Sequence, residues 1–153
     1  MGQAPARAGG PAFGRGTRSG DRLARIVGAR GVDEFADAVN LVGRWPGKRG
    51  KGDRFPVREA RTAADGVDLS GRPFVVLVGC GPARVFGWAG GYFEWFLVRG
   101  VPAVMVPHPS GVNHWWNLGK NRRAAARFLR GLCGGARRRR REGGNRAEDD
   151  AQA

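Results

Sequence analysis

The most regular apolar pattern in the chain consists of two short runs that lack polar alternation. These runs are Pro73–Gly79 (PFVVLVG) and Val101–Val106 (VPAVMV). Short apolar runs that are rich in β-branched residues predict buried strands. Because neither run alternates with polar residues, we expect both faces of each strand to be covered, as in a parallel sheet. Val39–Val42 is a further short apolar segment and predicts a brief strand around Asn40.

Segments with helical patterns surround these predicted strands. Helices are expected from Ser19 to about Val27 with Ser19 as the cap, from Glu34 to Ala38 with Asp33 as the cap, over Pro56–Ala64, and over Lys120–Leu132 with arginines on one face. Between the two strands, Pro82–Trp88 and Tyr92–Val98 are expected to be helical or turn-like. This alternation predicts an α/β fold, a three-layer α/β/α sandwich with a short, mostly parallel sheet.

The length and the charge of the chain narrow its class. Its 153 residues suit one domain, which we place at residues 1–133. The formal net charge of +14 favours a polyanionic partner such as DNA. The sequence contains no apolar run of bilayer length and no hydrophobic signal region, so we expect no membrane association. The expected protein is monomeric and cytoplasmic.

The cysteines and histidines predict neither a metal nor another cofactor. Cys80 and Cys133 are isolated and form no CxxC or other metal-binding spacing. A disulfide framework is not expected, which suits a reducing compartment. His108 and His114 have no nearby cysteine or carboxylate that would complete a zinc site.

Residues 134–153 differ in composition from the rest of the chain. The arginine run Arg137–Arg141 lies between two glycine pairs and is followed by the acidic end Glu148–Asp150. This composition predicts a disordered, solvated tail. The alternative is that the arginine run contacts DNA, in which case it would add salt-sensitive affinity without setting base choice.

The segment that follows the second predicted strand carries the chemistry. Base-flipping enzymes need a clamp on the backbone, an apolar group that enters the base stack and a polar group held against the base. Pro107–Asn117 (PHPSGVNHWWN) resembles motif 2 of the uracil-DNA glycosylase superfamily, an HPS or NPSG sequence followed by an apolar wedge. The resemblance implies that His108 hydrogen-bonds uracil O2 as negative charge builds there. It assigns the remaining roles to Ser110 and Gly111 as a backbone pinch, Val112 as the wedge, and Asn113 along the groove or as a brace of the loop.

The N-terminal residues resemble motif 1 of the same superfamily. Gly2–Ala6 (GQAPA) compares with GQDPY, GEAPG or GLAPA, and Phe13 and then Ser19 and Gly20 follow in the corresponding places. The resemblance implies that Ala4 and Pro5 line the floor of the base pocket and that Phe13 stacks on the flipped base. It also implies that the helix N-terminus at Ser19 and Gly20 binds a phosphate. The alternative for Phe13 is an ordinary core or loop aromatic.

A third segment, Asn40 with Leu41 and Val42, resembles the short strand whose asparagine recognises the pyrimidine. A carboxamide presents one donor and one acceptor, which pair with O4 and N3–H of uracil and mismatch the edge of cytosine. The alternative is that Asn40 caps a helix end. The resemblance as a whole spans residues 2 to about 132.

The chain departs from the superfamily pattern in three ways. Gln3 and Ala4 stand where GQDPY and GEAPG members carry a carboxylate; Gln3 can orient a water but is no general base. Two isolated cysteines cannot ligate the four-iron cluster common in the GEAPG and GLAPA types, which implies a cluster-free branch. The central strand that should precede motif 1 is missing, since Met1 adjoins Gly2, and we expect an earlier start of the natural chain.

Three functions are therefore compared. The first is a glycosylase of base-excision repair that flips uracil out of DNA and hydrolyses its N-glycosidic bond. The second, suggested by the missing carboxylate, is a non-catalytic nucleic-acid-binding member of the superfamily. The third is a nucleotide-processing α/β enzyme, based on the sequence GCGPAR at residues 79–84, in which Arg84 replaces the last glycine of GxGxxG.

Overall fold

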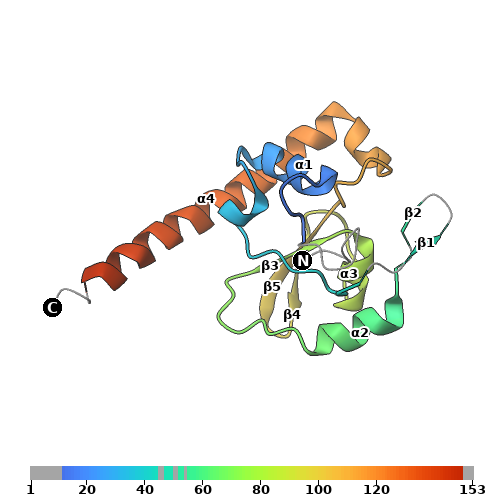
Figure 1. The fold of residues 1–153 in the computed structure, drawn as a ribbon, viewed down its shortest axis with the longest axis horizontal. Helices are drawn as coiled ribbons and strands as arrows, with labels where there is room; N and C mark the ends of the chain where they lie inside the picture. The colour runs from blue at the N-terminus through green and yellow to red at the C-terminus, as the bar shows by residue number, and fades with distance from the viewer. Residues whose placement is uncertain (1–11, 45–46, 50–51, 54, 150–153) are drawn as a thin grey trace.

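The computed structural model describes residues 12–44, 47–49, 52–53 and 55–149, with the backbone alone at 48, 49, 52, 53 and 135–149. Within these residues, the main sheet has three strands, β3 (Val75–Val78), β4 (Trp95–Val98) and β5 (Val101–Val106). β5 lies in the centre, parallel to β3 and antiparallel to β4 (Figure 1). The protein therefore has a small α/β fold, and the strands predicted from the two apolar runs are confirmed.

β4 corrects the prediction that Tyr92–Val98 is helical or turn-like. It forms a hairpin with β5 through Arg99 and Gly100, whose φ values are 48° and 79°. Positive φ at both turn positions is the geometry that matches the twist of paired strands. Arg99 also donates to the Val67 carbonyl at 2.8 Å, which ties the turn to the preceding loop. The described sheet is consequently mixed and not mostly parallel.

The helical elements surround this sheet. They are α1 (Arg18–Val27), α2 (Val57–Asp65), α3 (Cys80–Val85) and α4 (Gly119–Asp149), with short 3-10 turns η1 (Val32–Glu34) and η2 (His114–Asn117). A small antiparallel ribbon, β1 (Lys48–Arg49) with β2 (Gly52–Asp53), lies in the basic loop that precedes α2. The helices predicted at Pro56–Ala64 and near Ser19–Val27 are thus confirmed with slightly different ends.

Local capping explains two differences from the predicted helices. Thr17, rather than Ser19, caps α1, because its Oγ1 accepts the Gly20 N–H at 3.1 Å. The helix expected from Glu34 to Ala38 is replaced by the single turn η1. Asp33 does not cap a helix there, since its carboxylate is paired with Arg15 at 2.8 Å. This pairing lowers the pKa of Asp33, chiefly through the hydrogen bond from Arg15.

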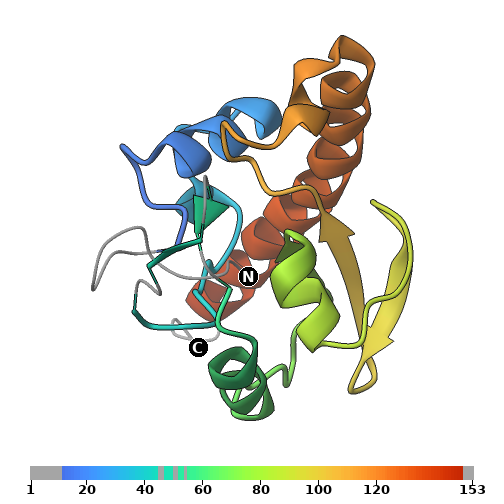
Figure 2. The same ribbon diagram turned by 90° about the vertical axis from the view of Figure 1, so that its right-hand side faces the viewer.

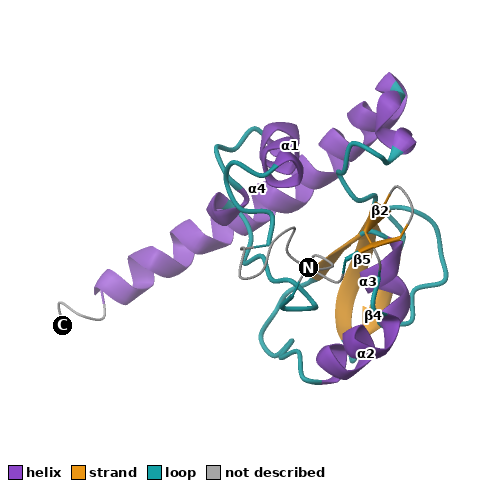
Figure 3. Cartoon of the chain, turned by 45° about the vertical axis from the view of Figure 1, so that its right-hand side comes forward, coloured by secondary structure: helices purple, strands orange, loops and turns teal. Residues whose placement is uncertain are grey.

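Side chains of β3 and β5 alternate between two cores on opposite faces of the sheet. On one face they pack against α3: Leu77, Ala103, Met105 and Ala83. On the other face they pack against α1 and α4: Val78, Val106, Leu23 and Leu129. Helices therefore contribute to the core on both faces of the sheet (Figures 2 and 3). This burial explains why both strand sequences lack polar alternation.

A third cluster joins the segment after η1 to α2. Leu41 and Val42 are buried with Ala60 and Ala64 of α2, and Val85 of α3 packs against them. The brief strand predicted at Val39–Val42 is reduced to a single β-bridge residue, Asn40. The buried side chains of Leu41 and Val42 therefore attach this segment to α2.

The last helix is longer than the predicted Lys120–Leu132. α4 continues to Asp149, so its backbone is helical over residues 134–149, for which the sequence predicted a disordered tail. Arginine and glutamate are good helix formers, which offsets the cost of the glycine pairs. The C-terminal part of α4 projects away from the rest of the molecule (Figure 1). No helix within the described residues combines the length and apolar character that a membrane span requires.

Candidate functional site

The loop predicted as motif 2 begins where β5 ends, beside the end of β3. Because β3 and β5 are parallel, their carboxyl ends share one edge of the sheet, a usual place for a site in an α/β fold. Gly79 follows β3, and its N–H donates to the Val106 carbonyl at 2.8 Å. A Cβ added at Gly79 would lie only 3.2 Å from the Cβ of His108. Glycine at this position therefore allows the two strand ends to approach closely.

We expect Gly79→Ala to lower the free energy of unfolding by about 1–3 kcal/mol, the usual cost of a strained backbone conformation. Gly79 has φ 93° and ψ 157°, which side chains rarely adopt, and the added methyl group would press on His108. Urea denaturation measures the loss. Gly43→Ala is the control, since nothing lies within 4 Å of a Cβ added there. Equal losses in the two variants would contradict the close approach.

His108 is held at both its ring and its backbone. The Ser110 N–H donates to His108 Nδ1 at 3.2 Å. A ring nitrogen that accepts a hydrogen bond carries no proton, so the neutral imidazole has its N–H at Nε2. The His108 side chain is half-buried. The ring of His108 is therefore held in a fixed orientation after β5, with the proton of the neutral imidazole at Nε2.

The carbonyl of His108 accepts two side-chain hydrogen bonds that brace the loop. Asn113 Nδ2 and Trp116 Nε1 each donate to it at 2.9 Å. Asn113 Oδ1 in turn accepts the Trp115 N–H at 3.1 Å and caps η2. Both ends of the Asn113 amide are thus hydrogen-bonded within the loop. Trp116 is buried, so this brace is attached to the protein core.

The tip of the loop is open to solvent. Gly111 and Val112 are exposed, and Val112 retains 63% of its accessible surface. Ser110 is half-buried, and its carbonyl accepts from Arg22 Nη1 at 3.3 Å. An exposed apolar side chain on a braced loop has the character that a wedge between bases requires.

Phe13 lies next to His108, although the two residues are far apart in the sequence. Their ring centroids are 6.0 Å apart and their planes are inclined at 46°. Phe13 is half-buried and has a left-handed φ of 50°. It also packs against the core between the sheet and α1. Both predicted roles are compatible with this position, since the ring packs on the core and yet remains partly exposed.

Ser19 and Gly20 occupy the first turn of α1. A Cβ at Gly20 would collide with the carbonyls of Phe13 and Gly14, so the helix packs on the preceding loop only because residue 20 is glycine. The Gly20 N–H already donates to Thr17 Oγ1. The helix N-terminus that is predicted to bind a phosphate therefore includes one amide that is hydrogen-bonded within the protein. Ser19 is half-buried.

The remaining predicted residues are Asn40 and the first residues of the predicted motif 1. Asn40 is half-buried between Ala38, which packs on the core beside α1 and α4, and Leu41, which packs on α2. Gln3, Ala4 and Pro5 lie outside the described residues. The structure thus brings together His108, Phe13 and the Ser110–Asn113 tip.

Two neighbours of the loop were not predicted from the sequence. Arg22 is one of them. The sequence feature that could have indicated it is the helical spacing that places it on the same face of α1 as Arg18 and Arg25. The other is Tyr92, whose ring centroid lies 5.5 Å from that of Trp115 in an edge-on contact. Burial raises the pKa of Tyr92, and the neighbouring Cys80 adds to the rise. Nothing in the sequence marks Tyr92, because its position depends on the β4 hairpin.

A separate cavity of about 1270 Å³ lies between α2 and α3. Its lining includes Arg44, Arg61 and Arg84 and none of the predicted site residues. Arg44 is paired with Glu59 through two hydrogen bonds of 2.9 and 3.3 Å. Among the described residues, no three His, Cys, Asp or Glu side chains gather as metal ligands would.

No protein-family model matches this chain, and neither a curated protein nor a solved structure matches it significantly.

Proposed function

We propose that the chain is a uracil-DNA glycosylase of base-excision repair, which flips uracil out of DNA and hydrolyses its N-glycosidic bond. The observation that carries the proposal is the setting of His108. Its Nδ1 accepts the Ser110 N–H at 3.2 Å, which places the ring proton of the neutral imidazole at Nε2, and its ring lies 6.0 Å from that of Phe13. An oriented neutral donor beside an aromatic ring suits a flipped base whose oxygen becomes anionic.

The proposed reaction breaks the bond between C1′ of the sugar and N1 of uracil. N1 takes the bonding electrons, and the negative charge spreads to O2 and O4 of the leaving base. His108 Nε2–H stabilises the charge at O2, and a preorganised donor is most effective where charge develops. Water adds to C1′ and releases its proton to solvent, with Gln3 as the residue that orients it. No carboxylate in motif 1 shares this work.

We propose that the other residues of the site contact the DNA. We assign Val112 as the wedge that fills the space of the flipped base, Ser110 and Gly111 as the contact with the backbone, and Phe13 as the stacking ring. We also propose that the fold is the three-layer α/β/α sandwich of this superfamily, which is supported by cores on both faces of the sheet. The proposed enzyme is monomeric and cytoplasmic and uses no cofactor.

Asn40→Asp tests the assignment of base recognition. A carboxylate accepts from the cytosine amine and has no donor for uracil O4, so discrimination between uracil and cytosine should fall by about 1–3 kcal/mol. The measurement compares single-turnover excision from matched duplexes that contain uracil or cytosine. Asn117→Asp, at an exposed position in η2, is the control. Unchanged discrimination in Asn40→Asp would mean that this residue does not contact the base.

A second candidate is a member of the superfamily that binds DNA without catalysis. Ala4 stands where other members carry a water-activating carboxylate. The absence of this carboxylate favours the non-catalytic candidate. A single experiment separates the two functions. Uracil-containing duplex is incubated with excess protein, bound DNA is quantified, and abasic sites are revealed by alkali. Binding with abasic sites supports the glycosylase, binding without them supports the second candidate, and no preference for uracil contradicts both.

A further inference from the structure

Six arginines form matching rows on two helices. The rows consist of Arg18, Arg22 and Arg25 on α1, and of Arg123, Arg127 and Arg130 on α4. Both have the spacing i, i+4, i+7, which places their side chains on one helical face. The buried residues of the same turns lie on the opposite faces: Gly20, Leu23 and Ala24 on α1, and Ala125 and Leu129 on α4. Both rows therefore point away from the core.

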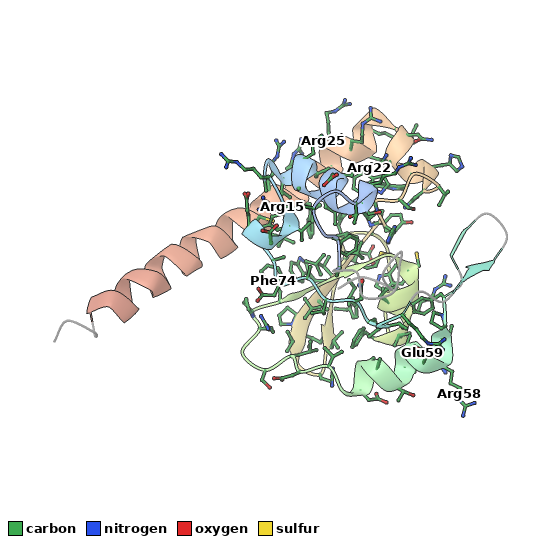
Figure 4. All side chains as sticks on the ribbon, viewed as in Figure 1. Arg15, Arg22, Arg25, Arg58, Glu59 and Phe74 are labelled. Carbon is green, nitrogen blue, oxygen red and sulfur yellow. The ribbon has the colours of Figure 1, made fainter. Side chains whose placement is uncertain are left out.

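The two rows belong to one surface. Leu23 of α1 and Leu129 of α4 share a core cluster on the same face of the sheet. Arg130 Nε also donates to the Ile26 carbonyl at 3.0 Å, which joins the helices directly. Figure 2 shows α1 and the first half of α4 side by side, and Figure 4 labels Arg22 and Arg25 on α1. We call the surface formed by the six arginines the arginine face.

Among the described residues, no arginine of the arginine face forms an ion pair with an acidic side chain. The ion pairs among the described residues involve Arg15, Arg44 and Arg72, which lie outside the arginine face. Asp21 is the acidic residue of α1, and its Oδ1 accepts the Gly16 N–H at 2.9 Å. Residues 119–134 of α4 contain no acidic residue. An array of positive charges of this kind favours a polyanion.

The arginine face adjoins the proposed site. Arg22 Nη1 donates to the Ser110 carbonyl at 3.3 Å, directly at the loop that carries His108. η2 leads from this loop into α4, and Arg122 holds that junction by donating to the Trp116 carbonyl at 2.9 Å. A ligand that reaches the Ser110–Val112 tip would therefore continue over α1 and α4.

We propose that the arginine face binds the phosphate backbone of duplex DNA beside the nucleotide held at His108; its placement next to a flipped base rests on the proposed function. Each row spans about 10 Å of helix, at about 1.5 Å per residue. Duplex DNA offers one charge per ~1.7 Å along its axis, so each arginine can reach a phosphate. Guanidinium groups match phosphate oxygens in geometry.

The test compares two variants that each lose three positive charges. The first is Arg18→Gln/Arg123→Gln/Arg127→Gln on the arginine face. The control is Arg58→Gln/Arg61→Gln/Arg84→Gln on α2 and α3, all exposed; Figure 4 shows Arg58 far from Arg22 and Arg25. Arg22 and Arg130 are kept, because they make hydrogen bonds within the protein. Glutamine preserves helix propensity, and thermal melting followed by circular dichroism checks the fold of each variant.

The affinity of each protein for a uracil-free duplex is measured at several salt concentrations. The slope of log K against log salt should become shallower by about 0.9 for each phosphate that is no longer neutralised, so by up to about 2.7 in the arginine-face variant. The control should keep the wild-type slope. Equal slopes in all three proteins, equal reductions in both variants, a larger reduction in the control, or no binding by the wild type would each overturn the proposal.

The same duplex experiment separates this proposal from the proposed function. Uracil-free DNA requires no excision, so a weakened slope in the arginine-face variant supports the surface even if the protein never releases uracil. Conversely, the wild type could excise uracil efficiently while the variant keeps the wild-type salt slope. This result would support the glycosylase assignment and overturn the proposal that the arginine face binds DNA.

Discussion

His108→Ala is expected to reduce the single-turnover rate of uracil excision on the order of 10²–10³-fold, the usual effect of losing one donor to a developing oxyanion. His108 is the donor that the structure orients, since the Ser110 N–H occupies Nδ1 and directs the proton to Nε2. Motif 1 offers no carboxylate to compensate. Binding of uracil-containing DNA should fall much less, because Phe13 and the Ser110–Val112 tip remain.

His114→Ala is the matched control for this experiment. His114 lies in the same segment but is exposed, and its Nδ1 faces Asn117 Nδ2 at 3.2 Å. The control should excise uracil at the wild-type rate. If His108→Ala also retains that rate, the motif 2 assignment is wrong. A loss of rate together with an equal loss of DNA affinity would show that the substitution disrupts the loop, and His108→Gln would then separate structure from catalysis.

Leu77→Ala is expected to lower the free energy of unfolding by about 2–5 kcal/mol, as large-to-small changes in a packed core do. Leu77 has no accessible surface and lies in β3, in the same core cluster as Met105 and Ala83. A loss of this size is a large part of the stability of a small domain. Urea denaturation followed by tryptophan fluorescence measures the change.

Leu97→Ala is the control for the core variant, since the same atoms are removed from the same sheet. Leu97 lies in β4 and retains 69% of its accessible surface. Its loss should change the free energy of unfolding by no more than about 0.5 kcal/mol, as is usual at exposed positions. A comparable loss in both variants would contradict the assignment of the buried and exposed faces of the sheet.

The sequence by itself determined the elements whose signals are local. Val75–Val78 and Val101–Val106 are strands because continuous β-branched runs can be buried on both faces. α1, α2 and the first half of α4 follow from apolar spacing at the helical period. The loop with His108 was located because it directly follows the second of these strands. Each of these inferences needs only neighbouring residues.

Only the tertiary structure decided the features that depend on distant partners. Trp95–Val98 became β4 because β5 offers it an antiparallel edge across the Arg99–Gly100 turn. Asp33 paired with Arg15 instead of capping a helix, a choice between two acceptable local partners. Phe13 reached His108 because α1 packs on the sheet and leaves the preceding loop beside the end of β5. Non-local pairing outweighs local propensity in these places, and a single sequence does not record which partner lies near in space.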